Sequence, residues 1–352
     1  MNLDLGAELA LGNLTSPPVL AFIAGIAVFL VTRRSLRYPR ALVTGLSVFL
    51  LLAIGLKGGV ALRTADVSDV LAPALAAIGL GALIPIAAFH ALQALTRLGA
   101  LDRGALAAHY GSTSLVTFTA AITMLEVVKI PFEGYVATLL TIMEIPGIVV
   151  GLMLARRAAD RAGAKVLVGA GGPPIEQAAD GSTSADAEPT SSWSHTLREV
   201  IAGPSVLLLV GGLILGFAVG PQAYDPIKPA LSTLFTAALT LYLLHLGFVA
   251  GERLRDVRAA GGGLIVFALA FPVAAGTIGV IAGTFTGMSA GGSAVLGVLC
   301  ASASYIAAPA AVGLALPRAN AGLCLTASLG LTFPFNLIIG IPLLVAIAQA
   351  LA

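Results

Sequence analysis

Long apolar stretches alternate with short polar loops along almost the whole chain of 352 residues. A helix that crosses the hydrocarbon core of a bilayer needs about 20 predominantly apolar residues. The stretches that approach or exceed this length have the approximate limits 17–32, 41–57, 69–95, 104–126, 133–155, 198–220, 227–250, 260–285, 290–316 and 319–350. The pattern predicts an all-α polytopic membrane protein with ten transmembrane helices.

One polar segment, residues 157–197, interrupts this pattern near the middle of the chain. It contains Gly-Gly-Pro-Pro, several Asp, Ser and Thr residues, and almost no large apolar residue before Trp193. This composition is typical of a flexible linker, and residues 193–199 are expected to form a short interfacial lead-in to the next helix. We interpret the linker as a solvated spacer, with docking of a partner protein as the alternative.

The sequences on the two sides of the linker resemble each other, which predicts two domains of five helices, residues 1–156 and 198–352. The similar segments are 16–26 and 203–213, 54–59 and 246–251, and 145–151 and 333–340. Their offsets of 187, 192 and 188 residues are nearly constant. Because five is an odd number, the second half enters the membrane from the opposite side, so the repeat is predicted to be inverted.

Composition agrees with a membrane protein, since 58% of the residues are hydrophobic and 10% are charged, whereas soluble domains are about 25% charged. The first residues include Asp4 and Glu8 but no Lys or Arg, so the first apolar stretch is expected to be a retained helix and not a signal peptide. Cys300 and Cys324 have no second Cys or His at metal-ligand spacing, and we interpret them as packing residues. The net charge of +2 gives no indication of nucleic-acid binding.

The positive charges are distributed unevenly between the two faces that ten spans would create. Fifteen of the 19 Lys and Arg residues fall in loops on one face, and the other face has Lys57, Arg63, Lys129 and Lys228. Cytoplasmic loops carry an excess of Lys and Arg. The distribution therefore predicts a multi-pass protein of the plasma (inner) membrane, with both termini outside and the 157–197 linker in the cytoplasm.

Two of the apolar stretches contain small and polar residues that a transmembrane helix rarely carries. In the fourth stretch, Gly111 is followed by the hydroxyl side chains of Ser112, Thr113, Ser114, Thr117, Thr119 and Thr123. The ninth stretch contains Ser302, Ser304 and Pro309. Irregular backbone at bilayer depth is tolerated only where it lines a cavity or is buried in protein. Interrupted helices at matching positions in two halves point to the binding site of a transporter.

Each break would expose a helix N-terminus, whose free N–H groups and partial positive charge favour an anion. Neither stretch contains Arg or Lys, so a small anion would be bound by these dipoles and by the hydroxyls of Ser112, Thr113, Ser114, Ser302 and Ser304. The same oxygens suit Na⁺. A membrane potential of about 100 mV opposes entry of one anion by about 2.3 kcal/mol, and co-binding of Na⁺ would remove that cost. Hydrogen bonding between packed helices is the alternative role for these hydroxyls.

Glu144, within Met143-Glu-Ile-Pro146, is a carboxylate near the middle of the fifth stretch. An acid inside a membrane costs roughly 2.5 to 3.5 kcal/mol on insertion scales, so Glu144 is a candidate for binding a cation or a proton. The alternative is a structural bond to the backbone that Pro146 leaves free.

The other polar residues within the stretches have less specific interpretations. For His90, His109 and His245, packing or bonding to a helix is at least as consistent with the sequence as proton transfer. Asn336 stands near Pro334 and is expected to satisfy a kinked backbone, with lining of the site as the alternative. Glu126 lies at the end of a stretch and is expected at the membrane interface.

Several short motifs are spread over both halves of the chain. They are Ser16-Pro, Gly55-Leu-Lys-Gly-Gly-Val-Ala-Leu-Arg63, Gly111-Ser-Thr, Met143-Glu-Ile-Pro146, Ala301-Ser-Ala-Ser-Tyr-Ile306 and Ile341-Pro-Leu-Leu. Together they resemble the sodium-dependent bicarbonate transporter superfamily, which includes the cyanobacterial sodium/bicarbonate symporter, from Ser16 to Ala352 apart from the linker. The resemblance implies broken fourth and ninth helices, a core domain that moves against a gate domain, and a homotrimer.

The resemblance also implies the ligands and partners. Bicarbonate would bind at the tips of the broken helices, against Gly111, Ser112, Thr113, Ser114, Ser304, Tyr305 and Ile306. Na⁺ would bind at the same tips. From the residues themselves, we expect the coupling ion, sodium or a proton, to bind to Ser112, Ser302, Ser304 and Glu144. No other cofactor is expected. A small cytoplasmic PII-like protein regulates the cyanobacterial relatives and is a candidate partner here.

One departure concerns the ninth stretch, where the cyanobacterial transporters have an acidic residue and this chain has Tyr305. A phenol is neutral at neutral pH and supplies no carboxylate oxygen to Na⁺. Transport of another small carboxylate and sodium/proton exchange through Glu144 are therefore alternatives, as is a non-transporting receptor. An intramembrane enzyme built on Ser112 and His109 is disfavoured, because their i, i+3 spacing is ordinary and an inverted repeat favours alternating access.

Overall fold

The computed structural model describes residues 15–34, 38–161, 198, 202–254, 257 and 261–352, and the regular structure there is helical. The first half contains α2 (Pro17–Thr32), α3 (Arg40–Thr64), α4 (Val67–Leu95), α5 (Ala100–Gly111), α6 (Leu115–Val127) and α7 (Val136–Arg161). The second half contains α9 (Pro204–Tyr224), α10 (Lys228–Arg253), α11 (Gly262–Phe285), α12 (Ala290–Ala301), α13 (Ala307–Ala315) and α14 (Ala321–Leu325), followed by η2 (Thr326–Thr332), α15 (Phe333–Phe335), η3 (Asn336–Gly340) and α16 (Ile341–Leu351).

The polar linker was predicted to begin at residue 157, but α7 continues to Arg161. The rest of that segment, including Trp193, lies outside the described residues, and so does most of the predicted lead-in at residues 193–199.

Seven helices in the described part of the chain are long and apolar enough to cross a membrane. They are α3, α4, α7, α9, α10, α11 and the continuous segment from Ala321 to Leu351. The other three predicted stretches are shorter: α2 has 16 residues, and the fourth and ninth stretches are each divided into two short helices. The all-helical, polytopic class is confirmed.

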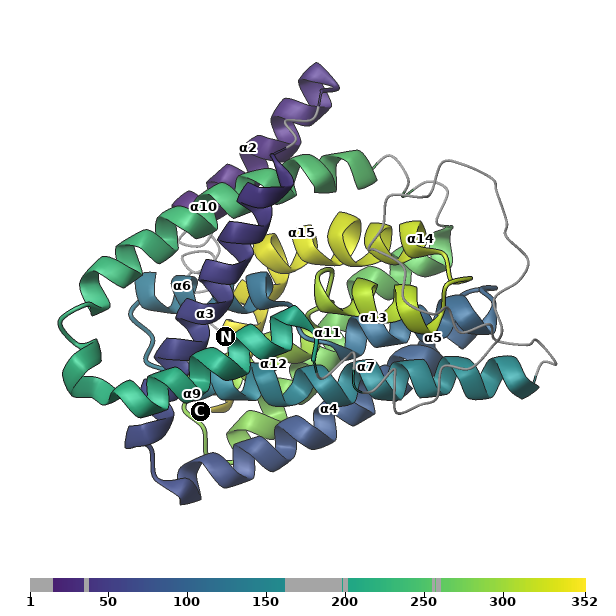
Figure 1. Cartoon of the computed structure of the whole chain (residues 1–352). Coiled ribbons are helices and arrows are strands. Elements are labelled where there is room, and N and C mark those ends of the chain that lie inside the picture. Colours follow the sequence, from purple (N-terminus) through teal and green to yellow (C-terminus); the bar gives the residue numbers. More distant parts are fainter. Residues whose placement is uncertain (1–14, 35–37, 162–197, 199–201, 255–256, 258–260) are drawn as a thin grey trace.

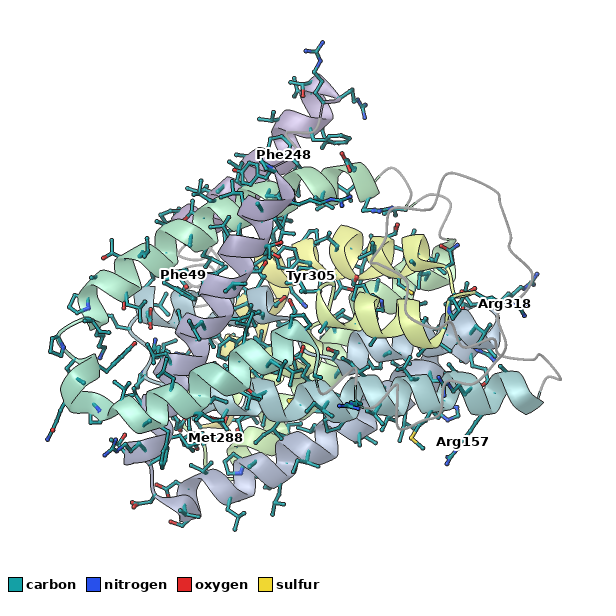
Figure 2. All side chains as sticks on the ribbon, viewed as in Figure 1. Phe49, Arg157, Phe248, Met288, Tyr305 and Arg318 are labelled. Carbon is teal, nitrogen blue, oxygen red and sulfur yellow. The ribbon has the colours of Figure 1, made fainter. Side chains whose placement is uncertain are left out.

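The helices form two groups (Figure 1). In the four-helix group, α2 packs along α10 and α3 packs along α9. In the broken-helix group, α5 packs on α4 and α7, and α12 packs on α11 and α16. Figure 2 shows Arg157 and Arg318 at the same end of the molecule.

Glycines determine how closely the four-helix group packs. A Cβ atom on Gly55 of α3 would lie 2.5 Å from the Leu209 carbonyl oxygen of α9, and one on Gly212 would lie 3.0 Å from the Gly55 Cα. The α2–α10 crossing is equivalent, with Gly25 and Gly247 in the same relation. Small residues let membrane helices approach at backbone distance, so these two crossings depend on the absence of side chains.

Prolines inside the long helices leave carbonyl groups without their intrahelical partner, and side chains from other helices satisfy several of them. The bonds run from Tyr135 to the Asp69 carbonyl before Pro73 (3.2 Å), from Arg63 to the Phe217 carbonyl before Pro221 (3.1 Å), and from Thr332 to the Ala268 carbonyl before Pro272 (2.8 Å). Backbone groups in lipid need such partners because no water is available. The kinks therefore also serve as points of contact between helices.

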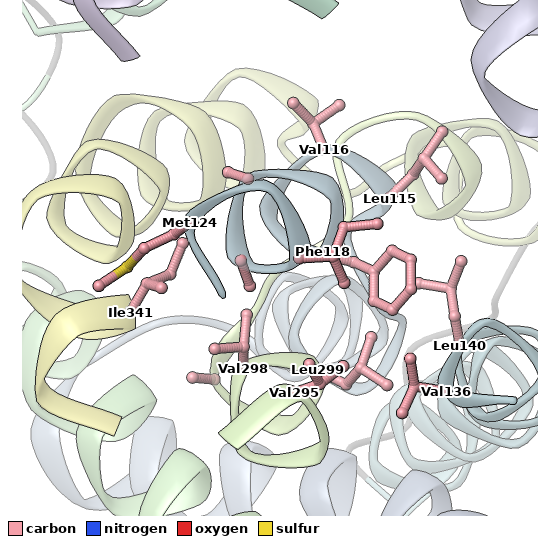
Figure 3. Close-up of a cluster of buried hydrophobic side chains, with 14 of the residues drawn as sticks. Leu115, Val116, Phe118, Met124, Val136, Leu140, Val295, Val298, Leu299 and Ile341 are labelled. Atoms are coloured by element: carbon pink, nitrogen blue, oxygen red, sulfur yellow. The ribbon is translucent and has the colours of Figure 1, made fainter. Parts of the chain in front are cut away.

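A buried apolar cluster holds the halves of the two broken helices against their neighbours (Figure 3). Phe118 of α6 lies beside Leu140 of α7 and faces Leu299 of α12, and Met124 at the far end of α6 lies beside Ile341 of α16. Phe118 and Leu299 are each 1% exposed. This packing fixes α6 and α12 relative to each other and so positions the two breaks.

Candidate functional site

The first break, between α5 and α6, is formed by Ser112, Thr113 and Ser114. Gly111 ends α5 where a Cβ would lie 2.7 Å from the Pro85 side chain and 2.8 Å from the Gly147 carbonyl oxygen. Ser114 then caps α6, because its hydroxyl oxygen accepts hydrogen bonds from Thr117 N (3.3 Å) and Thr117 Oγ1 (2.9 Å). The glycine allows α5 to pack tightly at its end, and the serine starts the second half-helix.

The second break, between α12 and α13, runs from Ser302 to Ile306. Ser302 Oγ donates to the Leu299 carbonyl at 2.8 Å, and Ser304 Oγ accepts from Ala308 N at 3.2 Å near the start of α13. The last carbonyl of α12, that of Ala301, accepts a hydrogen bond from Asn336 Nδ2 at 2.8 Å. Asn336 therefore satisfies freed backbone, as expected, but the backbone is that of the broken ninth helix.

The two breaks are joined directly by hydrogen bonds. Ser304 N donates to the His109 carbonyl at 2.7 Å, and His109 Nδ1 lies 2.7 Å from the Ser304 carbonyl. A carbonyl only accepts, so Nδ1 carries the proton in this contact. Ser114 N donates to Ser302 Oγ at 2.9 Å. His109 thus bonds to the opposite backbone, one of the two roles that its sequence position allowed.

A small cavity of about 20 Å³ opens where the broken helices face the four-helix group. Its lining residues are Leu51, Thr113, Ser114, Leu115, Leu140, Glu144, Leu209, Ser304, Tyr305, Ile306 and Ala307. Both half-helix N-termini contribute, since Ser114 and Leu115 begin α6 and Ile306 and Ala307 begin α13. Tyr305 lies well inside the molecule (Figure 2). The cavity thus has the helix ends that favour an anion.

Six of the nine candidate site residues line this cavity: Thr113, Ser114, Glu144, Ser304, Tyr305 and Ile306. Gly111, Ser112 and Ser302 do not. Gly111 is enclosed by α4 and α7, and Ser302 is used in joining the breaks. Ser112 Oγ is buried and has no hydrogen-bond partner among the described residues.

The donors that remain free in the cavity follow from these bonds. The oxygens of Ser114 and Ser304 accept backbone N–H groups, which leaves each hydroxyl hydrogen available to donate. The Tyr305 hydroxyl lies near Ser114, but within the described residues no partner completes a hydrogen bond of normal geometry with it. Three of the lining residues therefore carry a hydroxyl whose hydrogen has no acceptor of normal geometry among the described residues.

Glu144 is the one carboxylate among the lining residues, and no Lys or Arg lines the cavity with it. Its side chain is 6% exposed and forms no hydrogen bond within the described part of the chain, including to the backbone that Pro146 frees. Desolvated acids without a partner are costly. The structural alternative for Glu144 therefore has no contact to support it.

The other residues considered from sequence lie elsewhere. His245 stacks on Tyr38 with ring centroids 5.1 Å apart, and His90 packs edge-on against Phe89. Glu126 forms an exposed ion pair with Lys57 at 2.7 Å. Cys300 and Cys324 are buried and free, and no three His, Cys, Asp or Glu residues gather in the described ranges.

Sequence reasoning missed the leucines of the cavity wall, Leu51, Leu115, Leu140 and Leu209. A leucine that faces a cavity looks the same in the sequence as one that faces lipid. Only the contact between α3, α9 and the broken helices distinguishes them.

A family model described as the Na⁺-dependent bicarbonate transporter superfamily matches residues 17–349. No curated protein matches the chain. The match covers both halves and includes both breaks.

Proposed function

Because the chain belongs to the Na⁺-dependent bicarbonate transporter superfamily, we propose that it is a secondary transporter that takes up bicarbonate with Na⁺ by alternating access. The observation that carries this proposal is the meeting of two helix breaks beside one cavity, with the N-termini of α6 and α13 among its lining. Fixed N–H dipoles and hydroxyl donors without a fixed cation suit a small anion that enters with its own counter-ion.

The proposed anion site uses the free donors of Ser114, Ser304 and Tyr305, with Thr113 and Ile306 completing the contact surface. Gly111 acts indirectly, by letting α5 end against α7. The proposed Na⁺ ligands are the Glu144 carboxylate and the oxygens of Ser112, Ser302 and Ser304. Ser112 supports this, because a buried hydroxyl without a partner calls for a ligand.

We further propose that the two halves, residues 1–156 and 198–352, are inverted repeats related by a pseudo-twofold axis. The glycine crossings support this. With the offsets of 187 and 192 residues, Gly25 is equivalent to Gly212, and Gly55 is equivalent to Gly247. The Gly25–Gly247 contact in the first crossing therefore has its equivalent in the Gly212–Gly55 contact of the second. Ser114 and Ser302, which bond to each other, are 188 residues apart. The axis would pass between them.

Contacts at the outer ends of the broken helices have the same relation. Glu133 Oε1 accepts from Ser289 N at 2.6 Å at the start of α12, and Asp102 Oδ1 accepts from Asn320 N at 2.8 Å before α14. An offset of 187 residues converts Glu133 into Asn320 and Asp102 into Ser289. The two pairs therefore occupy equivalent positions. The acid is at the first of these positions in one pair (Glu133) and at the other position in the second pair (Asp102).

The inverted arrangement gives the proposed motion two moving parts. The four-helix group would serve as the gate domain and the broken-helix group as the core domain, with the cavity between them exposed alternately to the two sides. Both termini would lie outside. A homotrimer and regulation by a PII-like protein through the 157–197 linker are carried over as part of this proposal.

The test is uptake of labelled bicarbonate into proteoliposomes, with and without an inward Na⁺ gradient. Wild-type protein is expected to show gradient-dependent uptake, and Ser112→Ala to lose it. Thr233→Ala is the matched control, since that exposed hydroxyl bonds only to its own helix at Pro229. Equal uptake in the absence of Na⁺ would contradict the coupling, and no uptake by folded wild-type protein would contradict the substrate.

Sodium/proton exchange is a second candidate, favoured by the unpaired Glu144 in the cavity. Under this alternative, an outward proton gradient would drive Na⁺ entry without bicarbonate. Replacement Glu144→Gln would abolish the exchange, because an amide carries neither a proton nor a charge in the cycle. Retained Na⁺ flux in that variant would exclude Glu144 as the exchanging group.

A further inference from the structure

The cavity has two chemically different sides. Ser114, Ser304 and Tyr305 of the broken-helix group supply the O–H donors, beside the apolar Leu115, Leu140, Ile306 and Ala307, whereas the four-helix group contributes only Leu51 of α3 and Leu209 of α9 to the lining. Leu51 is 5% exposed and Leu209 is fully buried. A ligand that spans the cavity therefore meets hydrogen-bond donors at one end and hydrocarbon at the other.

The backbone that carries the two leucines is held in place. The Leu209 carbonyl lies at the α3–α9 crossing, where a Cβ on Gly55 would be only 2.5 Å from it. Leu51 is one helical turn before Gly55 on the same helix. Because the helices touch at backbone level there, this wall has no room to recede from a ligand.

A carboxylate and bicarbonate share the same planar pair of oxygens, but they differ at the third position on carbon. Bicarbonate carries an oxygen there, and the leucines give that oxygen no hydrogen-bond partner. A short aliphatic acid carries a methyl or ethyl group there, for which the leucines are a favourable contact. The lone Glu144 and the absence of Lys and Arg among the lining residues disfavour a dianion.

We infer, on the premise of the proposed function, that the cavity also takes short aliphatic monocarboxylates of the size of acetate and propionate. The carboxylate binds at the N-termini of α6 and α13, and the alkyl group lies against Leu51 and Leu209. These two leucines are specificity-determining residues, because they set the length of the alkyl group that fits.

The test is calorimetric binding of sodium acetate, propionate, butyrate and bicarbonate to the purified full-length protein in detergent, at constant Na⁺. Binding avoids the leakage of protonated acids through liposomes. Wild-type protein is expected to bind acetate and propionate and to reject butyrate. Leu51→Ala and Leu209→Ala are expected to raise the affinity for butyrate relative to acetate by about tenfold, the typical effect of a methylene in an apolar pocket.

Matched controls lie on the same helices. Leu52 and Leu207 are 38% and 56% exposed and do not line the cavity, so Leu52→Ala and Leu207→Ala are expected to keep the wild-type order of chain lengths. If an alanine variant does not fold, Leu51→Val and Leu209→Val make the smaller truncation. Leu51→Asn adds a hydrogen-bonding group and is expected to favour bicarbonate over acetate.

The outcomes separate this inference from the proposed function. Bicarbonate binding without acetate binding, or an unaltered chain-length order in both cavity variants, would overturn the inference alone. Acetate binding without bicarbonate binding would support the inference and contradict bicarbonate as the substrate. Chain-length selectivity that moves equally in the control variants would also overturn it, because the effect would then not come from the cavity wall.

Discussion

The four-helix group and the broken-helix group both depend on small residues, but for different reasons. In the four-helix group, Gly25 and Gly55 let regular stretches of two helices touch, and backbone atoms of the partner helix are the nearest neighbours of an added Cβ there. In the broken-helix group, Gly111 lies beside a run of hydroxyls, and the helices stop and restart there. The difference teaches that a small residue in a membrane helix indicates close approach, and that hydroxyls beside it distinguish an opened helix from a packed one.

The largest effect is expected from filling a crossing of the four-helix group. Gly55→Ala places a methyl group against the Leu209 carbonyl, so we expect destabilisation by about 3 kcal/mol, at the upper end of the usual cost of overpacking. Heating the detergent-solubilised protein and measuring the monodisperse fraction by size-exclusion chromatography would detect it. Gly45 lies on the same helix with no atom within 4 Å of an added Cβ, and a comparable loss in Gly45→Ala would show that the crossing is not the cause.

A smaller loss of stability, but a complete loss of transport, is expected when the hydrogen bond between the two helix breaks is removed. Ser302→Ala removes the acceptor of Ser114 N and leaves a buried N–H unpaired, which costs about 1–3 kcal/mol. Uptake is expected to be lost, because the start of α6 loses its bond to the second break, while the bonds between His109 and Ser304 remain. Thr277, whose hydroxyl bonds only to the Val273 carbonyl of its own helix, provides the control variant Thr277→Ala. Normal uptake by Ser302→Ala would mean that the join does not position the site.

The carbonyl freed by Pro272 gives a prediction of intermediate size and a double-mutant cycle. Thr332→Val removes the hydroxyl that donates to the Ala268 carbonyl at 2.8 Å and accepts from the Tyr110 hydroxyl at 2.6 Å, and it is expected to cost about 1–3 kcal/mol. In a Pro272→Ala background the helix can supply the missing N–H, so the same replacement should cost less. Melting temperatures of the four proteins measure the coupling, and additive effects would contradict this account of the kink.

The smallest effect is expected from the ion pair that joins the two groups. Lys57 of α3 and Glu126 of α6 lie 2.7 Å apart, but their side chains are 38% and 54% exposed. Exposed pairs contribute about 0–1 kcal/mol, so Lys57→Gln should shift the melting temperature little, and less at high salt. A loss of stability as large as that of Gly55→Ala would contradict this expectation. It would show that a polar contact between the two groups stabilises the protein as much as a glycine crossing inside the four-helix group.

The sequence predicted the fold class, because each apolar stretch must satisfy a fixed membrane thickness, but it predicted the element limits only in part: 41–57 stops seven residues before the end of α3, and 198–220 begins six residues before α9. The stretch 17–32 coincides with α2, and 69–95 differs from α4 by two residues at its start. The two breaks were also predictable, because hydroxyls and glycine are costly in lipid unless a cavity or a neighbour needs them. The end of α7 was not predictable, because the polar sequence that follows it contains no signal for where the helix stops once it has left the membrane.

By itself, the sequence determined a polytopic helical protein, the positions of its helix breaks and the family to which the motifs belong. Only the tertiary structure decided which hydroxyls face the cavity, since Thr113 and Ser114 line it while Ser112 and Ser302 do not. The reason is geometric: which side chains of a break face the cavity depends on how α5, α7 and α12 pack around it. The same holds for Leu51 and Leu209, whose role follows from two helices distant in sequence meeting the broken pair.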